Sequence, residues 1–199
     1  MTPELFAGLF AFAAVSAWTP GPNNTILMAS GLAHGFRRTL PMILGVVIGF
    51  PMMIAIVGLG LGRIFETVPQ LYTIMKYAGA AYMLWLAYKI ASAKPATADN
   101  GSEAKPLTFL QGVAFQWINP KGWIMALTAL SAYTLPAAYS LGVMVVSLTF
   151  LAVGVTSSCG WTLFGTGLRQ LLTDPRWFRL VNVGLALALV ASLVPMLRH

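Results

Sequence analysis

Long apolar segments separated by short polar connections run along most of the chain. A transmembrane helix needs about 20 consecutive, mostly apolar residues. Six segments reach or approach that length, so the pattern predicts an all-α integral membrane protein with six transmembrane helices in one domain, residues 1–199. The predicted spans cover approximately residues 4–33, 39–61, 71–91, 107–132, 135–164 and 180–197.

Two of these spans, the first and the fourth, are interrupted by residues that break a helix. Proline lacks the N–H that a helix needs and clashes with the preceding turn, so each helix is expected to stop and restart. In hydrocarbon, a freed backbone group costs several kcal/mol unless it finds a partner. Broken helices at membrane depth are therefore typical of a transport site. The interrupting residues are Thr19, Pro20, Gly21, Pro22, Asn23 and Asn24 in the first span, and Asn119, Pro120 and Lys121 in the fourth.

The two halves of the chain are similar to each other. Thr19-Pro20 corresponds to Asn119-Pro120 at an offset of 100 residues, and two further short matches follow in the same order. A repeat of three spans must reverse its orientation in the membrane, so the pattern predicts two inverted-topology repeats. The repeats cover about residues 4–92 and 107–199, with a polar loop at about 93–106 between them. The sequence leaves open whether the two breaks meet in one cavity.

The composition supports a membrane protein and excludes several kinds of site. Of the residues, 58% are hydrophobic and 9% are charged, whereas soluble domains have about 25% charged residues. The net charge of +7 comes from short connecting loops, which the positive-inside rule explains without nucleic acid. Cys159 is the single cysteine, so no disulfide or redox pair can form within the chain. No Asp or Glu lies inside a predicted span away from its ends, and no metal or other cofactor is expected.

The distribution of Lys and Arg predicts the orientation. The odd-numbered connections hold eight of them and the other side holds three, which places the odd connections in the cytoplasm and both termini outside. The eight are Arg37, Arg38, Lys89, Lys94, Lys105, Arg169, Arg176 and Arg179, and the three are Arg63, Lys76 and Arg198.

The two breaks offer groups that could bind a substrate. A helix that restarts at Pro20 or Pro22 points its first N–H groups at the break, which suits a carboxylate. Asn23 and Asn24 add amide donors and acceptors. A kink that only improves packing is the alternative reading. Thr156, Ser157, Ser158 and Asn182 are expected to form hydrogen bonds between helices.

Lys121 is the single ionisable residue within a predicted span and away from its ends. An intramembrane charge costs a few kcal/mol even on lenient scales, so it needs partners. Backbone carbonyls at a helix break, water, or an anionic substrate could fill that role. Lys121 is thus the candidate carboxylate anchor and the candidate carrier of a coupling proton. A lysine that extends its ammonium group to the membrane interface is the structural alternative.

The motifs together resemble those of the LysE/RhtB amino-acid exporters. Residues 19–23 match the TPGPN signature of that family, and residues 119–121 match its NPK motif. The basic turn from Leu32 to Arg38 and the stretch from Tyr77 to Tyr82 are also similar. Residues 34–37 and 85–90 look most like the cysteine and O-acetylserine exporter branch, and the resemblance to the family implies a location in a bacterial inner membrane.

The resemblance implies a transporter and not an enzyme: a secondary, proton-driven exporter of amino acids or small derivatives. The substrate would lie between the two breaks, the bilayer would be the solvent, and a homo-oligomer is compatible with this reading. Cation transport and membrane redox chemistry are the alternatives. A hard cation prefers carboxylate oxygens and redox exchange needs a cysteine pair, and the predicted spans contain neither.

Overall fold

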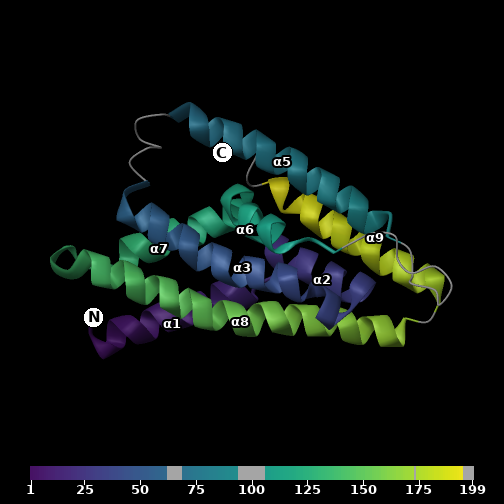
Figure 1. Ribbon diagram of the computed structural model, residues 1–199, viewed down its shortest axis with the longest axis horizontal. Helices are drawn as coiled ribbons and strands as arrows, with labels where there is room; N and C mark the ends of the chain where they lie inside the picture. Colours follow the sequence, from purple (N-terminus) through teal and green to yellow (C-terminus); the bar gives the residue numbers. More distant parts are fainter. Residues whose placement is uncertain (62–68, 94–105, 173, 195–199) are drawn as a thin grey trace.

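A computed structural model describes residues 1–61, 69–93, 106–172 and 174–194. Within these ranges all regular structure is helical, which confirms the all-α prediction (Figure 1). The helices are α1 (Pro3–Trp18), α2 (Pro22–His34), α3 (Phe36–Ile56), α5 (Pro69–Ala91), α6 (Phe109–Ile118), α7 (Pro120–Tyr133), α8 (Tyr139–Leu171) and α9 (Pro175–Ala191). Two short segments, η1 (Val57–Leu61) and η2 (Pro136–Ala138), follow α3 and α7.

Both predicted helix breaks are confirmed. The first span divides into α1 and α2, whose axes are bent by 50°. The fourth divides into α6 and α7 at Asn119, whose backbone is extended and which caps both helices. Each second half begins with proline, Pro22 in α2 and Pro120 in α7. Proline suits this first helical position because its missing N–H would have had no partner there.

The predicted basic loop at residues 169–179 is wrong for most of its length. Helix α8 continues through Arg169 to Leu171, and α9 begins at Pro175. Asp174 caps α9 by accepting a hydrogen bond from the backbone N–H of Arg176 at 2.7 Å. Helix α8 has 33 residues, or about 50 Å at 1.5 Å per residue, which is longer than the roughly 30 Å apolar core of a bilayer.

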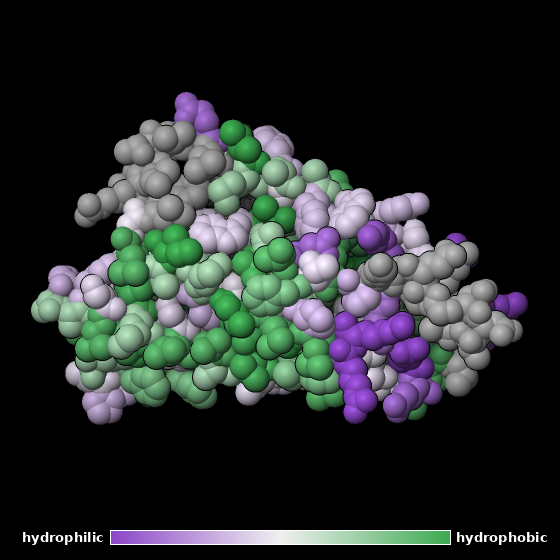
Figure 2. Space-filling view, viewed as in Figure 1, coloured by the Kyte–Doolittle hydropathy of each residue, from purple (hydrophilic) through white to green (hydrophobic). Residues whose placement is uncertain are grey.

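Fewer of the described helices are long and apolar enough to cross a membrane than the six spans that the sequence predicts. Among the described residues, Phe36–Gly60 and Pro136–Leu171 are long and apolar enough to cross a membrane, and the bent pair α1–α2 would be a third. Residues 94–105, which hold most of the predicted polar loop with Lys94 and Lys105, lie outside the described part of the chain, as do Arg63 and Arg198. Figure 2 shows apolar side chains over much of the visible face and hydrophilic ones gathered toward one end, as expected for a multi-pass membrane protein.

Glycines set the positions of the helices that carry the breaks. Helix α2 packs most extensively against α8, where Gly31 lies on the Thr162 carbonyl and Gly165 on the Met28 carbonyl. Helix α3 packs against α6 through Gly45 and Gly112 in the same way. Small residues allow such close backbone approach between membrane helices. These contacts place the first break beside α8 and the second beside α3.

Candidate functional site

The two helix breaks meet through Lys121. This lysine lies in the first turn of α7, and its Nζ donates a hydrogen bond to the Thr19 carbonyl at 2.7 Å and to the Pro20 carbonyl at 3.4 Å. Because α1 ends at Trp18, these carbonyls lie where the helix can no longer satisfy them. A cation at the C-terminal end of a helix is also stabilised by the helix dipole. Backbone carbonyls were one predicted partner, and they belong to the other break.

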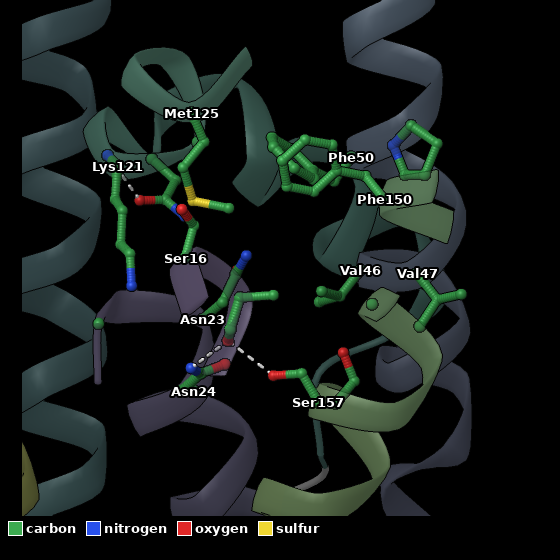
Figure 3. Close-up of a pocket in the computed structure, with 17 residues that line it drawn as sticks. Ser16, Asn23, Asn24, Val46, Val47, Phe50, Lys121, Met125, Phe150 and Ser157 are labelled. Carbon is green, nitrogen blue, oxygen red and sulfur yellow. Dashed lines mark hydrogen bonds between the residues drawn. The ribbon is translucent and has the colours of Figure 1, made fainter. Parts of the chain in front are cut away.

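Asn24 and Ser157 hold the end of α1 in place (Figure 3). Asn24 Nδ2 donates hydrogen bonds to the Ala17 and Thr19 carbonyls at 2.8 and 2.9 Å. Ser157 Oγ, from α8, donates to the same Ala17 carbonyl at 2.7 Å. The amide nitrogen of Asn24 therefore stabilises the break itself. Ser157 bonds between helices as predicted, whereas Asn182 Nδ2 bonds within its own helix, to the Phe178 carbonyl.

A reciprocal pair of amides joins Asn23 to Gln116. Asn23 Nδ2 donates to Gln116 Oε1 at 2.9 Å, and Gln116 Nε2 donates back to Asn23 Oδ1 at 3.2 Å. Gln116 is fully buried in α6 and also donates to the Gly112 carbonyl at 2.9 Å. The sequence interpretation missed Gln116. The sequence feature that could have identified it is an amide side chain in an otherwise apolar segment, about one helical turn before Asn119.

Asn119 sets the start of α7 and thus the direction of Lys121. Its side-chain Oδ1 accepts a hydrogen bond from the Lys121 backbone N–H at 3.2 Å, and the residue is 2% exposed. At the other break, the N-cap residue of α2 is Gly21, which has no side chain to cap the helix. The first N–H groups of α2 therefore have no capping side chain and suit an anion. A Cβ on Gly21 would overlap the Lys121 side chain, so glycine keeps the path of that lysine open.

A pocket lies between the breaks and the long helices α3 and α8. In Figure 3, Lys121 lies along one side, while Phe50 and Phe150 form the opposite side. The pocket contains about 550 Å³ of empty space, including its open mouth. One wall is therefore polar and charged and the other apolar. The lining residues are Ser16, Ala17, Gly21, Asn23, Asn24, Val46, Val47, Phe50, Pro51, Asn119, Lys121, Gly122, Met125, Phe150, Gly154, Ser157 and Ser158.

Five of the nine predicted site residues line this pocket, and the other four support it. Gly21, Asn23, Asn24, Asn119 and Lys121 form part of the wall. Thr19 and Pro20 supply the carbonyls that hold the lysine, and Pro22 and Pro120 start the second helix of each break. The apolar wall escaped sequence interpretation because Val46, Phe50 and Phe150 look like any other apolar residues of a span. Within the described residues, no cluster of His, Cys, Asp or Glu could hold a metal ion.

Two broken helices that meet at a half-polar pocket are typical of a membrane transporter. The sequence matches the family of LysE type translocators over residues 14–194. The chain belongs to that family, and it is a translocator and not an enzyme. The resemblance seen in its motifs is thereby confirmed.

Curated relatives cover nearly the whole chain. The cysteine/O-acetylserine efflux proteins of Escherichia coli (strain K12) and Shigella sonnei (strain Ss046) are each 33% identical over 192 residues, which is 96% of this chain and 96% of each relative. The protein of that name from Shigella flexneri matches to the same extent. These relatives belong to the predicted branch. No solved structure matches the chain.

Proposed function

We propose that this protein is a secondary active exporter that moves amino acids or small amino-acid derivatives out of the cytoplasm and binds them between its two helix breaks. The observation that carries the proposal is the Lys121 ammonium group, which lies on the carbonyls at the end of α1 and on the wall of a half-polar pocket. The relatives named as cysteine and O-acetylserine efflux proteins support this substrate class.

The pocket complements a zwitterion. The substrate carboxylate binds to Lys121 and to the uncapped start of α2 at Gly21. When the lysine turns toward that carboxylate, it releases the carbonyls of Thr19 and Pro20, which then accept hydrogen bonds from the substrate ammonium group. The exchange keeps every charged group paired at each stage. It also explains how the pocket binds an ammonium group although no acidic residue is among the described residues that line it.

Lys121 is also the candidate for proton coupling. Among the described residues that line the pocket, it is the one ionisable side chain. Export driven by an inward proton gradient requires antiport, in which a proton enters the cell for each substrate that leaves. We assign the binding and release of that proton to Lys121.

We also propose that the chain crosses a bacterial inner membrane six times as two inverted repeats, with both termini outside. Helix α3 packs against α8, and α5 packs against α9 (Figure 1). Each pair joins corresponding spans of the two halves, as a two-fold relation between repeats would require. Reporter fusions at both ends test the orientation, and a cytoplasmic signal from either terminus would contradict it. The proposed arrangement of six spans is compatible with both a monomer and a homo-oligomer.

The proposed function is tested by transport with the purified protein in lipid vesicles. We expect an imposed proton gradient to drive movement of radiolabelled cysteine or O-acetylserine, and an uncoupler to abolish it. Vesicles without protein are the control. If the vesicles with protein move neither of these compounds nor serine, the proposed substrate class is wrong.

Replacing Asn23 with alanine is expected to raise the half-saturating substrate concentration about tenfold. The change removes from the pocket an amide that is placed to bind the substrate, and a hydrogen bond to a charged group contributes about 1.5–3 kcal/mol. It also leaves the buried Gln116 amide without its partner. The concentration dependence of export measures the effect. Asn182→Ala removes another buried amide, outside this pocket, and should leave half-saturation unchanged. An Asn23→Ala variant with wild-type half-saturation would contradict the assignment.

A further inference from the structure

Helix α8 presents a row of residues to the pocket. Phe150, Gly154, Ser157 and Ser158 all line it, and because the last three follow Phe150 at intervals of four, seven and eight residues, all of them lie on one face of the helix. The Phe150 ring packs edge-on against Phe50, with ring centroids 5.3 Å apart. Ser157 is bonded to the end of α1. Gly154 therefore lies between the apolar wall and the polar wall.

Neither packing nor backbone conformation requires glycine at position 154. A Cβ built there would have no atom within 4 Å, unlike one at Gly31 or Gly165, which would overlap backbone of a neighbouring helix. The positive-φ glycines of the described chain are Gly35 and Gly60, so Gly154 has ordinary helical geometry. Alanine forms helices better than glycine. The missing side chain at Gly154 thus leaves empty space in the pocket and has no evident structural use.

The location of this space indicates what fills it. Lys121 lies on the opposite side of the pocket from α8 (Figure 3). A substrate whose carboxylate is held at Lys121 has its side chain directed across the pocket, toward the wall that Phe50 and Phe150 form with α8. Gly154 lies one helical turn from Phe150, so the empty space at Gly154 adjoins that wall.

We infer that Gly154 determines which substrates fit, because its missing side chain makes room for the side chain of the exported amino acid. This inference rests on the proposed function. It assigns the polar wall to the carboxylate and ammonium groups common to all amino acids. It assigns the space at Gly154 to the side chain that distinguishes them, and the size of residue 154 then limits the size of the substrate.

The test is a series of Gly154 variants assayed with substrates of increasing size. Gly154→Ala and Gly154→Val are compared with wild type for export of serine and of the longer O-acetylserine in vesicles. We expect the efficiency ratio of O-acetylserine to serine to fall about tenfold or more in Gly154→Val, and less in Gly154→Ala. Gly167→Val is the matched control, because Gly167 lies in the same helix, also has open space at its Cβ position, and does not line the pocket. Its ratio should equal that of wild type.

Three outcomes would overturn the inference. An equal loss for both substrates in Gly154→Val would show that position 154 serves the transport movement, and an unchanged ratio with full export would show that substrates do not reach it. A Gly154→Val protein that does not fold while Gly167→Val does would show a structural need for glycine, and size-exclusion chromatography detects this. The proposed function fails separately, if wild-type protein exports neither serine nor O-acetylserine.

Discussion

Replacing Lys121 with methionine is expected to reduce export about a hundredfold or more. Methionine has a similar length and preserves the apolar contacts of the lysine stem, so the change removes mainly the charge. A hydrogen bond to a charged group contributes about 1.5–3 kcal/mol, and the substrate carboxylate loses that bond in the variant. The ammonium group also holds the carbonyls of Thr19 and Pro20, so the two breaks lose one of the contacts that join them. Initial rates of substrate efflux from vesicles measure the loss.

Two controls separate the loss of the site from general damage. Lys76→Met removes a lysine from α5, outside the pocket, and should export at the wild-type rate. Chromatography and thermal unfolding in detergent show whether the Lys121→Met protein still folds. A folded Lys121→Met protein with wild-type export would refute the role of this lysine.

The helix breaks could be predicted from sequence because their causes are local. Pro20 and Pro22 cannot continue a helix, and Asn119 before Pro120 is both an end and a start. The meeting of the breaks could not be predicted in this way. It depends on the reach of the Lys121 side chain to a carbonyl 102 residues away, and no local pattern records such a contact.

The part of the site that escaped prediction is of two kinds. Gln116 could have been predicted from sequence, because it is an amide within an otherwise apolar helix, three residues before Asn119. Phe150 and Gly154 carry no signal, because an apolar or small residue in a span is the expected background. Their role follows from the face of α8 that they share, and only the packing of α8 against the first break turns that face toward a pocket.

Charge misled the interpretation at the end of α8. Arg169 and Arg176 suggested a loop, since charged residues normally lie outside a membrane span. A helix can be longer than the apolar layer is thick, however, and α8 continues through Arg169 to Leu171. Hydropathy marks where the bilayer ends, whereas the caps mark where the helix ends. Here Asp174 and Pro175 start the next helix.

The contact between α2 and α8 leads to the second large effect, which concerns folding. Gly165→Val is expected to prevent recovery of folded protein. A Cβ at this position would overlap the Met28 carbonyl, and Gly31 makes the reciprocal contact with the Thr162 carbonyl. Overpacking a core typically costs about 1–3 kcal/mol and occasionally more. At position 165 the added side chain would overlap backbone atoms, which cannot rotate away as a side chain can. We therefore expect Gly165→Val to lower the free energy of unfolding by about 3 kcal/mol or more.

The matched variant for this prediction is Gly167→Val. Both substitutions place the same β-branched residue in the same helix two positions apart, so they share any cost in helix propensity. Position 167 has open space where its Cβ would lie. Thermal unfolding and the yield of monodisperse protein should therefore match wild type for Gly167→Val and fall sharply for Gly165→Val. Equal behaviour of the two variants would mean that α2 and α8 do not pack through their glycines, and the first break would then lack the support that holds it beside the pocket.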